Sequence, residues 1–157
     1  MDSELIKKQR AFFDGIKYSI DIAVLSYNRL EQALIKYSNK EGNSKPTSED
    51  FCRALIDVWS IIDSIFRLRK IIESTPGIEN SPERKIFFAQ TKKVEDARHY
   101  IQHVNEKVSL ILHNNTSLWG SLSWFRIHSE KEGTICSLKP GTYFDQENTP
   151  MVNPSGK

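Results

Sequence analysis

Apolar residues recur every three or four positions along residues 3–38, and this spacing strongly limits what the segment can form. Steps of three and four place side chains on one face of an α-helix. About 35 helical residues would span about 50 Å. The stripe consists of Leu5, Phe12, Ile16, Ile20, Ala23, Tyr27, Leu30, Leu34 and Tyr37. A polar run that includes Gly42 and Pro46 then ends the helix.

A second helical stripe begins after this polar run. Thr47 or Ser48 can cap the helix, with Asp50 reaching back from the first turn. Pro76 and Gly77 end it. Its stripe is broad, which indicates contacts on more than one side, and contains Phe51, Leu55, Val58, Ile62, Ile65 and Ile72.

The third stripe starts at a well-formed helix beginning. Ser81 supplies a capping hydroxyl and Pro82 fits the first helical position. The three-four spacing then continues to His113, so we expect one uninterrupted helix. Three long helices with short connections predict an antiparallel bundle.

The pattern changes after the third stripe. Residues 118–128 are rich in aromatic and β-branched side chains, residues 130–133 supply a turn, and residues 134–138 form a second candidate strand. An isolated hairpin is marginal in water, so we expect its large aromatic residues to pack on the bundle. These residues are Trp119, Trp124 and Phe125.

The predicted fold is therefore mainly α, an antiparallel bundle of three long helices with a C-terminal β-hairpin. Residues 1–115 would form the bundle, and residues 116–157 would form the hairpin and a polar tail packed on it. The tail has no evident closing element, which predicts exposed sheet edges and a truncated chain.

Composition narrows the class of protein. The chain has 157 residues, of which 38% are hydrophobic and 27% charged, as in a soluble globular domain. The net charge of +2 excludes a strongly basic coat but leaves room for local basic patches. No apolar run approaches the roughly 20 residues of a membrane span. The N-terminus does not resemble a signal peptide, and Cys52 and Cys136 match no metal spacing. We expect a cytoplasmic protein with reduced thiols and no membrane partner.

The most chemically complete segment of the chain is residues 95–103. Arg98 can hold a phosphate, and His99 and His103 can move protons near neutral pH. Arg98 and His103 are five residues apart, about 140° around an ideal helix, so one helix would aim them in different directions.

Arg98, four intervening residues and His103, with His99 in the polar position after the arginine, resemble the signature of the HEPN superfamily. The flanking residues 97–106 also resemble the HEPN motif helix. The resemblance covers the helical part of the chain, and its specific content is this ten-residue segment.

The resemblance implies a helical bundle that forms a homodimer, with the motif helices of two protomers facing a shared groove. In catalytic members this groove cleaves RNA without a metal or other cofactor. Arg98 would stabilise the scissile phosphate, His103 would act as general acid or base, and His99 would assist as a polar group. The leading expectation is thus a metal-independent endoribonuclease of the toxin or phage-defence kind, for which an antitoxin-like protein partner is also expected.

Two alternatives use the same segment. Glu95, His99 and His103 are spaced by four and share a helix face, so they could ligate a divalent metal. The cluster can also be a solvated helix face, where exposed ion pairs contribute only about 0.5 kcal/mol. In that case the chain would be a non-catalytic helical module that binds a partner protein.

Further basic residues could guide an RNA backbone. Lys92 and Lys93 precede Arg98 by one to two turns, and Arg67 lies on the second helix. Arg67 is four residues after Asp63, which predicts a helix-face ion pair or, alternatively, support for Arg98. Arg67, Arg69 and Lys70 can equally be cations that favour the C-terminal end of a helix dipole. Tyr27, Trp59 and Phe66 are expected in the core or a dimer interface.

Overall fold

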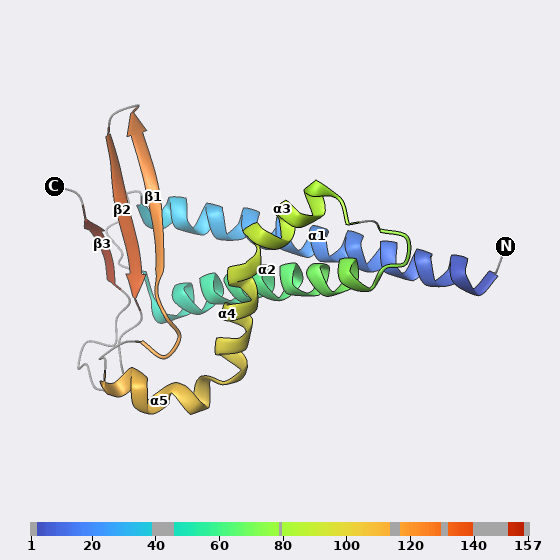
Figure 1. The fold of residues 1–157 in the computed structure, drawn as a ribbon. Helices are drawn as coiled ribbons and strands as arrows, with labels where there is room; N and C mark the ends of the chain where they lie inside the picture. Colours follow the sequence, from blue (N-terminus) through green and yellow to red (C-terminus); the bar gives the residue numbers. More distant parts are fainter. Residues whose placement is uncertain are drawn as a thin grey trace. The chain divides into compact units, whose positions relative to one another are not determined.

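The computed structural model describes residues 3–38, 46–78, 80–113, 117–129, 132–139 and 151–155. Over these ranges the protein is mainly helical, with five helices followed by a small antiparallel sheet (Figure 1). The elements are α1 (Ser3–Ser38), α2 (Ser48–Ser74), α3 (Pro82–Gln90), α4 (Lys92–Gln102), α5 (Val104–His113), β1 (Leu122–Ser129), β2 (Glu132–Lys139) and β3 (Met151–Ser155). None of the described helices has both the length and the hydropathy needed to cross a lipid bilayer.

Local capping residues begin α2 and α3 where the sequence predicts them. The amide of Asp50 donates to Oγ1 of Thr47 (3.2 Å), and the amide of Thr47 donates to the Asp50 carboxylate (2.9 Å). The hydrogen bonds from the amide and hydroxyl of Thr47 lower the pKa of Asp50. At α3, Ser81 Oγ accepts from the amide of Arg84 (3.2 Å). These side chains satisfy amides that have no partner within their own helix.

The predicted third long helix is instead three shorter ones, α3, α4 and α5, because Thr91 and His103 interrupt it. The hydroxyl of Thr91 donates to the carbonyl oxygen of Phe87 (2.6 Å). The amide of Glu106 donates to the carbonyl oxygen of His103 (3.0 Å), a three-residue step characteristic of a turn. The apolar spacing continues across both interruptions, so periodicity alone did not reveal them.

The chain divides into two compact units. Unit 1 comprises Met1–Asn28 and Asp57–Gln102, and unit 2 comprises Arg29–Ile56 and His103–Lys157. Helices α1 and α2 therefore each contribute one part to each unit.

In unit 1, α1 and α2 pack closely and run antiparallel. A Cβ atom on Gly15 would lie 2.9 Å from Cδ1 of Ile71, so the absence of a side chain permits the close approach. Further along, the side chain of Gln9 lies 4.0 Å from the Cβ position of Gly77. Ser19, one turn after Gly15, is buried. Gly15 therefore lets α1 approach α2 closely, beside the half-buried Phe12 and Ile16.

Unit 2 contains the sheet, in the order β1-β2-β3. The predicted hairpin is confirmed: β1 pairs antiparallel with β2, and Phe125 lies opposite Ile135. Strand β3, which was not predicted, pairs antiparallel with β2 and contains Pro154. Proline is tolerated there because β3 is an edge strand among the described residues.

The two faces of the hairpin differ. On one face Cys136 and Leu138 are buried, and Nε1 of Trp124 donates to Oγ of Ser38 at the end of α1 (2.8 Å). On the other face the Phe125 side chain is 63% exposed. The expectation that Trp119, Trp124 and Phe125 all pack inward is therefore wrong for Trp119 and Phe125, which remain exposed.

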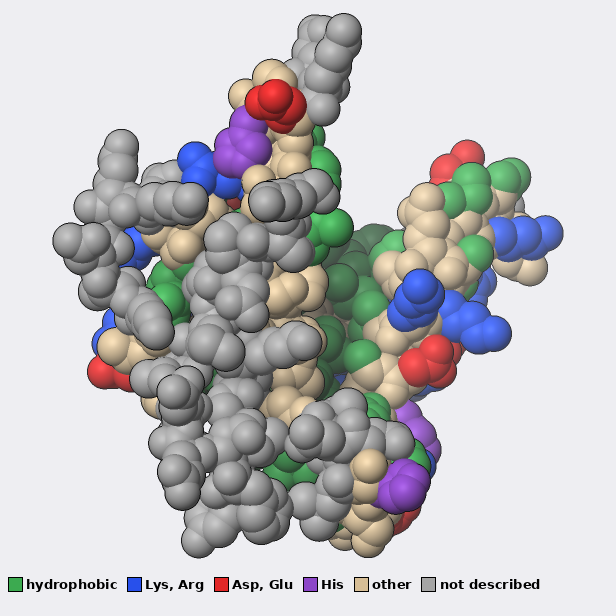
Figure 2. All heavy atoms as spheres, turned by 90° about the vertical axis from the view of Figure 1, so that its left-hand side faces the viewer, with side chains coloured by type: hydrophobic (Ala, Val, Ile, Leu, Met, Phe, Trp, Pro, Cys, Tyr) green, Lys and Arg blue, Asp and Glu red, His purple; other side chains and the backbone are tan. Residues whose placement is uncertain are grey.

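Large hydrophobic side chains remain at the surface of both units, and one view shows several beside charged groups (Figure 2). The longest run is on α1 within unit 1, where the exposed residues are Leu5, Phe13, Tyr18, Ile20, Ile22, Val24, Leu25 and Tyr27. Both cysteines are free, Cys52 exposed and Cys136 buried.

Candidate functional site

Arg98 is held on α4 between a carboxylate and an aromatic ring. Its Nε lies 2.9 Å from Oδ1 of Asp63 on α2, which is ion-pair distance, although the Nε–H makes no hydrogen bond. The guanidinium carbon is 5.7 Å from the ring centroid of Phe66, also on α2. The Arg98 side chain is 27% exposed. This arrangement orients the cation and leaves part of it accessible to a ligand.

Asp63 also binds a second arginine. Its Oδ2 accepts a hydrogen bond from Nε of Arg67 at 2.5 Å, one turn further along α2. This hydrogen bond and the charge of Asp63 raise the pKa of Arg67. Asp63 therefore forms the predicted ion pair with Arg67 along α2 and also contacts Arg98 on α4. Two guanidinium groups share one carboxylate, so the group keeps a net positive charge that favours phosphate.

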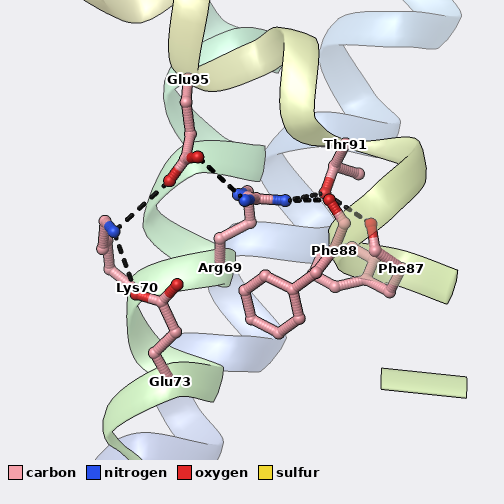
Figure 3. Close-up of polar contacts among 7 residues, drawn as sticks. All are labelled: Arg69, Lys70, Glu73, Phe87, Phe88, Thr91 and Glu95. Atoms are coloured by element: carbon pink, nitrogen blue, oxygen red, sulfur yellow. Dashed lines mark hydrogen bonds and ion pairs between the residues drawn. The ribbon is translucent and has the colours of Figure 1, made fainter. Parts of the chain in front are cut away.

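A neighbouring cluster around Arg69 fastens α2 to the junction of α3 and α4 (Figure 3). Only 5% of the Arg69 side chain is exposed. Its Nη1 donates to the carbonyl oxygen of Phe88 (2.7 Å) and to Oγ1 of Thr91 (2.5 Å), and its Nη2 lies 3.1 Å from Oε2 of Glu95. The guanidinium carbon is also 4.8 Å from the Phe88 ring centroid. A buried guanidinium with several partners is a structural cross-link.

Glu95 is bound by two cations, which argues against the metal alternative. Its Oε1 lies 3.4 Å from Nζ of Lys70, and its other oxygen pairs with Arg69. Burial raises the pKa of Glu95, but the charges and hydrogen bonds of Arg69 and Lys70 outweigh it, so the pKa lies below its ordinary value. Over the described ranges, no group of three or more His, Cys, Asp or Glu residues could hold a metal ion.

His103 lies in the turn between α4 and α5 and belongs to unit 2. Its Nδ1 is 2.9 Å from Oε1 of Glu106. A carboxylate on one ring nitrogen fixes the orientation of an imidazole and leaves the chemistry to Nε2 on the opposite edge. Because the helix ends before His103, the ideal-helix angle of about 140° to Arg98 no longer applies.

The predicted site residues are divided between the two units. Unit 1 contains Arg67, Lys92, Lys93, Arg98 and His99, and unit 2 contains His103. Lys92 and Lys93 are exposed in the first turn of α4, and His99 is exposed near its end. Within unit 1, Arg98 and Arg67 are brought together through Asp63.

Sequence reasoning missed the role of Arg69, although a signal was present. Ile62, Ile65, Arg69 and Ile72 follow one another at steps of three, four and three, so a cation occupies a position of the apolar stripe. Such a residue is rarely buried unless it is paired. Its neighbour Phe66 was expected in the core or an interface, and it lies beneath the cations of Arg98 and Lys70.

Comparison of the chain with protein-family models, curated proteins and solved structures finds no match.

Proposed function

We propose that this protein is a HEPN-like helical domain that binds RNA through its phosphates and cleaves it without a metal. The observation that carries the proposal is the environment of Arg98. Asp63 and Phe66 fix the guanidinium in place, yet it remains accessible. A pre-oriented cation stabilises charge that develops on a phosphate during reaction better than a mobile one does.

The proposed reaction is an internal transfer at phosphorus. The ribose 2′-hydroxyl gives its proton to a base while its oxygen bonds to phosphorus. The bond from phosphorus to the 5′-oxygen breaks, and that oxygen takes a proton from an acid. The products are a 2′,3′-cyclic phosphate and a 5′-hydroxyl.

His103 is proposed as the acid or base, with Glu106 at its Nδ1 fixing the ring. Arg98 stabilises the negative oxygens of the transition state, and His99 is an auxiliary polar group. Lys92, Lys93 and Arg67 would contact neighbouring phosphates. In the homodimer that the resemblance implies, the motif helices of two protomers supply these groups to a shared groove.

Purified protein incubated with single-stranded RNA in EDTA tests the proposal. We expect cleavage that leaves 2′,3′-cyclic phosphate ends, and a loss of roughly a hundredfold or more in Arg98→Ala and in His103→Ala. Arg53→Ala is the matched control, because Arg53 is a surface arginine paired within its own helix to Glu49. RNA that stays intact at high protein concentration would exclude the ribonuclease.

The alternative is a non-catalytic module that binds a protein partner, including an antitoxin-like one. The exposed face of the hairpin favours it, since Phe125, Ile127 and Ile135 are 63%, 72% and 50% exposed. An antiparallel sheet commonly places polar residues on its solvated face. Under this alternative Arg98→Ala has no functional effect and the RNA remains uncut.

A further inference from the structure

The two oxygens of Asp63 hold their arginines in different ways. Nε of Arg67 donates a hydrogen bond to Oδ2 at 2.5 Å, and both residues lie on α2, one turn apart. Nε of Arg98 lies 2.9 Å from Oδ1, but its N–H makes no hydrogen bond. An ion pair that is also hydrogen-bonded is stronger than one that has only proximity. Asp63 is therefore anchored to Arg67, and its contact with Arg98 is the weaker of the two.

The anchored carboxylate places a negative charge beside the cation that would receive a phosphate. The side chains of Arg98 and Asp63 are 27% and 32% exposed, so a ligand that reaches the guanidinium also meets the carboxylate. Carboxylate and phosphate oxygens bind an arginine through the same N–H donors. They consequently compete for Arg98.

The other cation at the Phe66 ring offers little countercharge to a phosphate. Nζ of Lys70 is 5.7 Å from the ring centroid, as is the guanidinium carbon of Arg98. Figure 3 shows Lys70 between two carboxylates, and its Nζ lies 3.0 Å from Oε2 of Glu73 and 3.4 Å from Oε1 of Glu95. The positive charge of Lys70 is therefore already balanced. A phosphate beside Phe66 depends on Arg98.

We propose that Asp63 is an internal competitor that occupies Arg98 until an RNA phosphate displaces it. Before RNA binds, the carboxylate orients the guanidinium and offsets part of its charge. When RNA binds, the phosphate replaces Oδ1 at Arg98, and Asp63 stays on α2 through the hydrogen bond of Oδ2 to Arg67. The inference rests on the proposed function for its ligand, and it adds a regulatory contact to the same site.

A competing role and a purely positioning role for Asp63 predict changes of opposite sign. If Asp63 only positioned Arg98, its replacement would leave the guanidinium mobile and weaken phosphate binding. If Asp63 competes, a neutral residue at this position frees Arg98 and strengthens phosphate binding. A unit charge that lies about 4 Å from a bound anion changes its affinity by roughly tenfold or more.

Fluorescence anisotropy with a labelled 2′-O-methyl RNA at one fixed salt concentration tests the proposal, because the blocked 2′-oxygen prevents cleavage. We expect Asp63→Asn to bind the RNA roughly tenfold more tightly than the natural chain. Asp63→Ser, which also lacks the charge, should show the same gain. The gain should vanish in the double variant Asp63→Asn/Arg98→Ala when it is compared with Arg98→Ala, because Asp63 acts through Arg98.

Glu49→Gln is the matched control. It also removes a carboxylate from an i, i+4 arginine pair on α2, since Glu49 lies 2.6 Å from Arg53, and it changes the net charge equally. Its affinity for the RNA should stay within about twofold of the natural chain, because solvent and salt screen a distant surface charge. Circular dichroism of each variant confirms that the helices persist.

Equal or weaker binding by both Asp63 variants would overturn the proposal, and so would a gain that persists without Arg98. The result is separable from that of the cleavage test, because the probe cannot be cut and His103 is unchanged. A chain that cleaves RNA but gains no affinity in Asp63→Asn keeps the proposed function and loses this inference. Tighter binding without cleavage does the reverse, and no binding by the natural chain or its variants excludes both.

Discussion

The two compact units bury opposite kinds of side chain. Among the described residues, the buried ones of unit 1 are all polar or charged: Ser19, Ser26, Asp57, Ser64, Arg69 and Thr75. Those of unit 2 are all apolar: Pro46, Phe51, Ala54, Leu55, Cys136 and Leu138. Unit 2 is built around an ordinary apolar centre, and unit 1 around close helix contact and a bound cation.

In unit 1, the close packing of two helices leaves large apolar side chains of α1 in contact with water. Gly15 leaves room for the Ile71 side chain, and Ser19 one turn later is buried, so part of the α1 surface removed from water belongs to small residues. Large residues such as Phe13 and Ile20 then remain at the surface. Polar cross-links such as Arg69 therefore act beside the half-buried apolar residues of α1 and α2 in holding unit 1 together.

Replacing the most buried residue of unit 2 should have the largest effect. Leu138 is 0% exposed, so Leu138→Ala removes packed methyl groups and leaves a cavity. We expect a loss of about 3 kcal/mol in the free energy of unfolding, measured by urea denaturation. Ile135→Ala on the same strand is the control, because Ile135 is 50% exposed and should cost less than about 1 kcal/mol. Equal losses would mean that the apolar centre is elsewhere.

Replacing the buried cation of unit 1 should have a somewhat smaller effect. Arg69→Ala removes the partner of Glu95, Thr91 and the Phe88 carbonyl together. We expect a loss of about 2–3 kcal/mol, below the usual cost of breaking a fully buried pair because Glu95 can reach water. Arg67→Ala is the control, since the Arg67 side chain is 67% exposed and should cost less than about 0.5 kcal/mol. If Arg69→Ala is as stable as Arg67→Ala, the contacts of Arg69 do not stabilise unit 1.

The smallest expected effect depends on pH. The folded-state pKa of Glu95 is lowered, so its carboxylate stabilises the fold above the ordinary carboxyl pKa and loses this effect as pH falls through the lowered value. Glu95→Gln should therefore reduce the unfolding free energy at neutral pH. The difference from the natural chain should shrink as pH falls below the ordinary carboxyl pKa and vanish below the lowered pKa of Glu95.

Asp96→Asn, next to Glu95 and exposed, is the control for denaturation curves recorded across this range. If the loss of unfolding free energy in Glu95→Gln stays the same at acidic pH, the position requires the shape of the side chain and not its charge.

Elements governed by local rules were predictable from the sequence. The spacing of apolar residues indicated α1 and α2, and the caps at Thr47 and Ser81 follow from side chains within three residues of the helix start. The hairpin was visible as a change to aromatic and β-branched residues followed by a turn. Each of these features depends only on neighbours along the chain.

Features that depend on distant neighbours were not predictable. The interruption at Thr91 coincides with its hydrogen bond to Arg69, 22 residues earlier. The strand β3 pairs with β2 through its backbone, which a polar sequence does not reveal. In the site, the i, i+4 pairing of Arg67 with Asp63 was a local prediction that is confirmed, while the burial of Arg69 required knowing what α2 packs against.

Helix α4 has no buried residue. Ion pairs that involve Asp63, Glu95, Arg69 and Lys70 join it to α2. A polyanion that binds Arg98 must compete with Asp63 for the same cation, and Lys70 lies over the same Phe66 ring as Arg98. The attachment of α4 to α2 would therefore weaken when such a ligand binds these cations or when a higher ionic strength screens them. Occupancy of the site and mobility of the segment that carries it would then be governed by one shared set of cations.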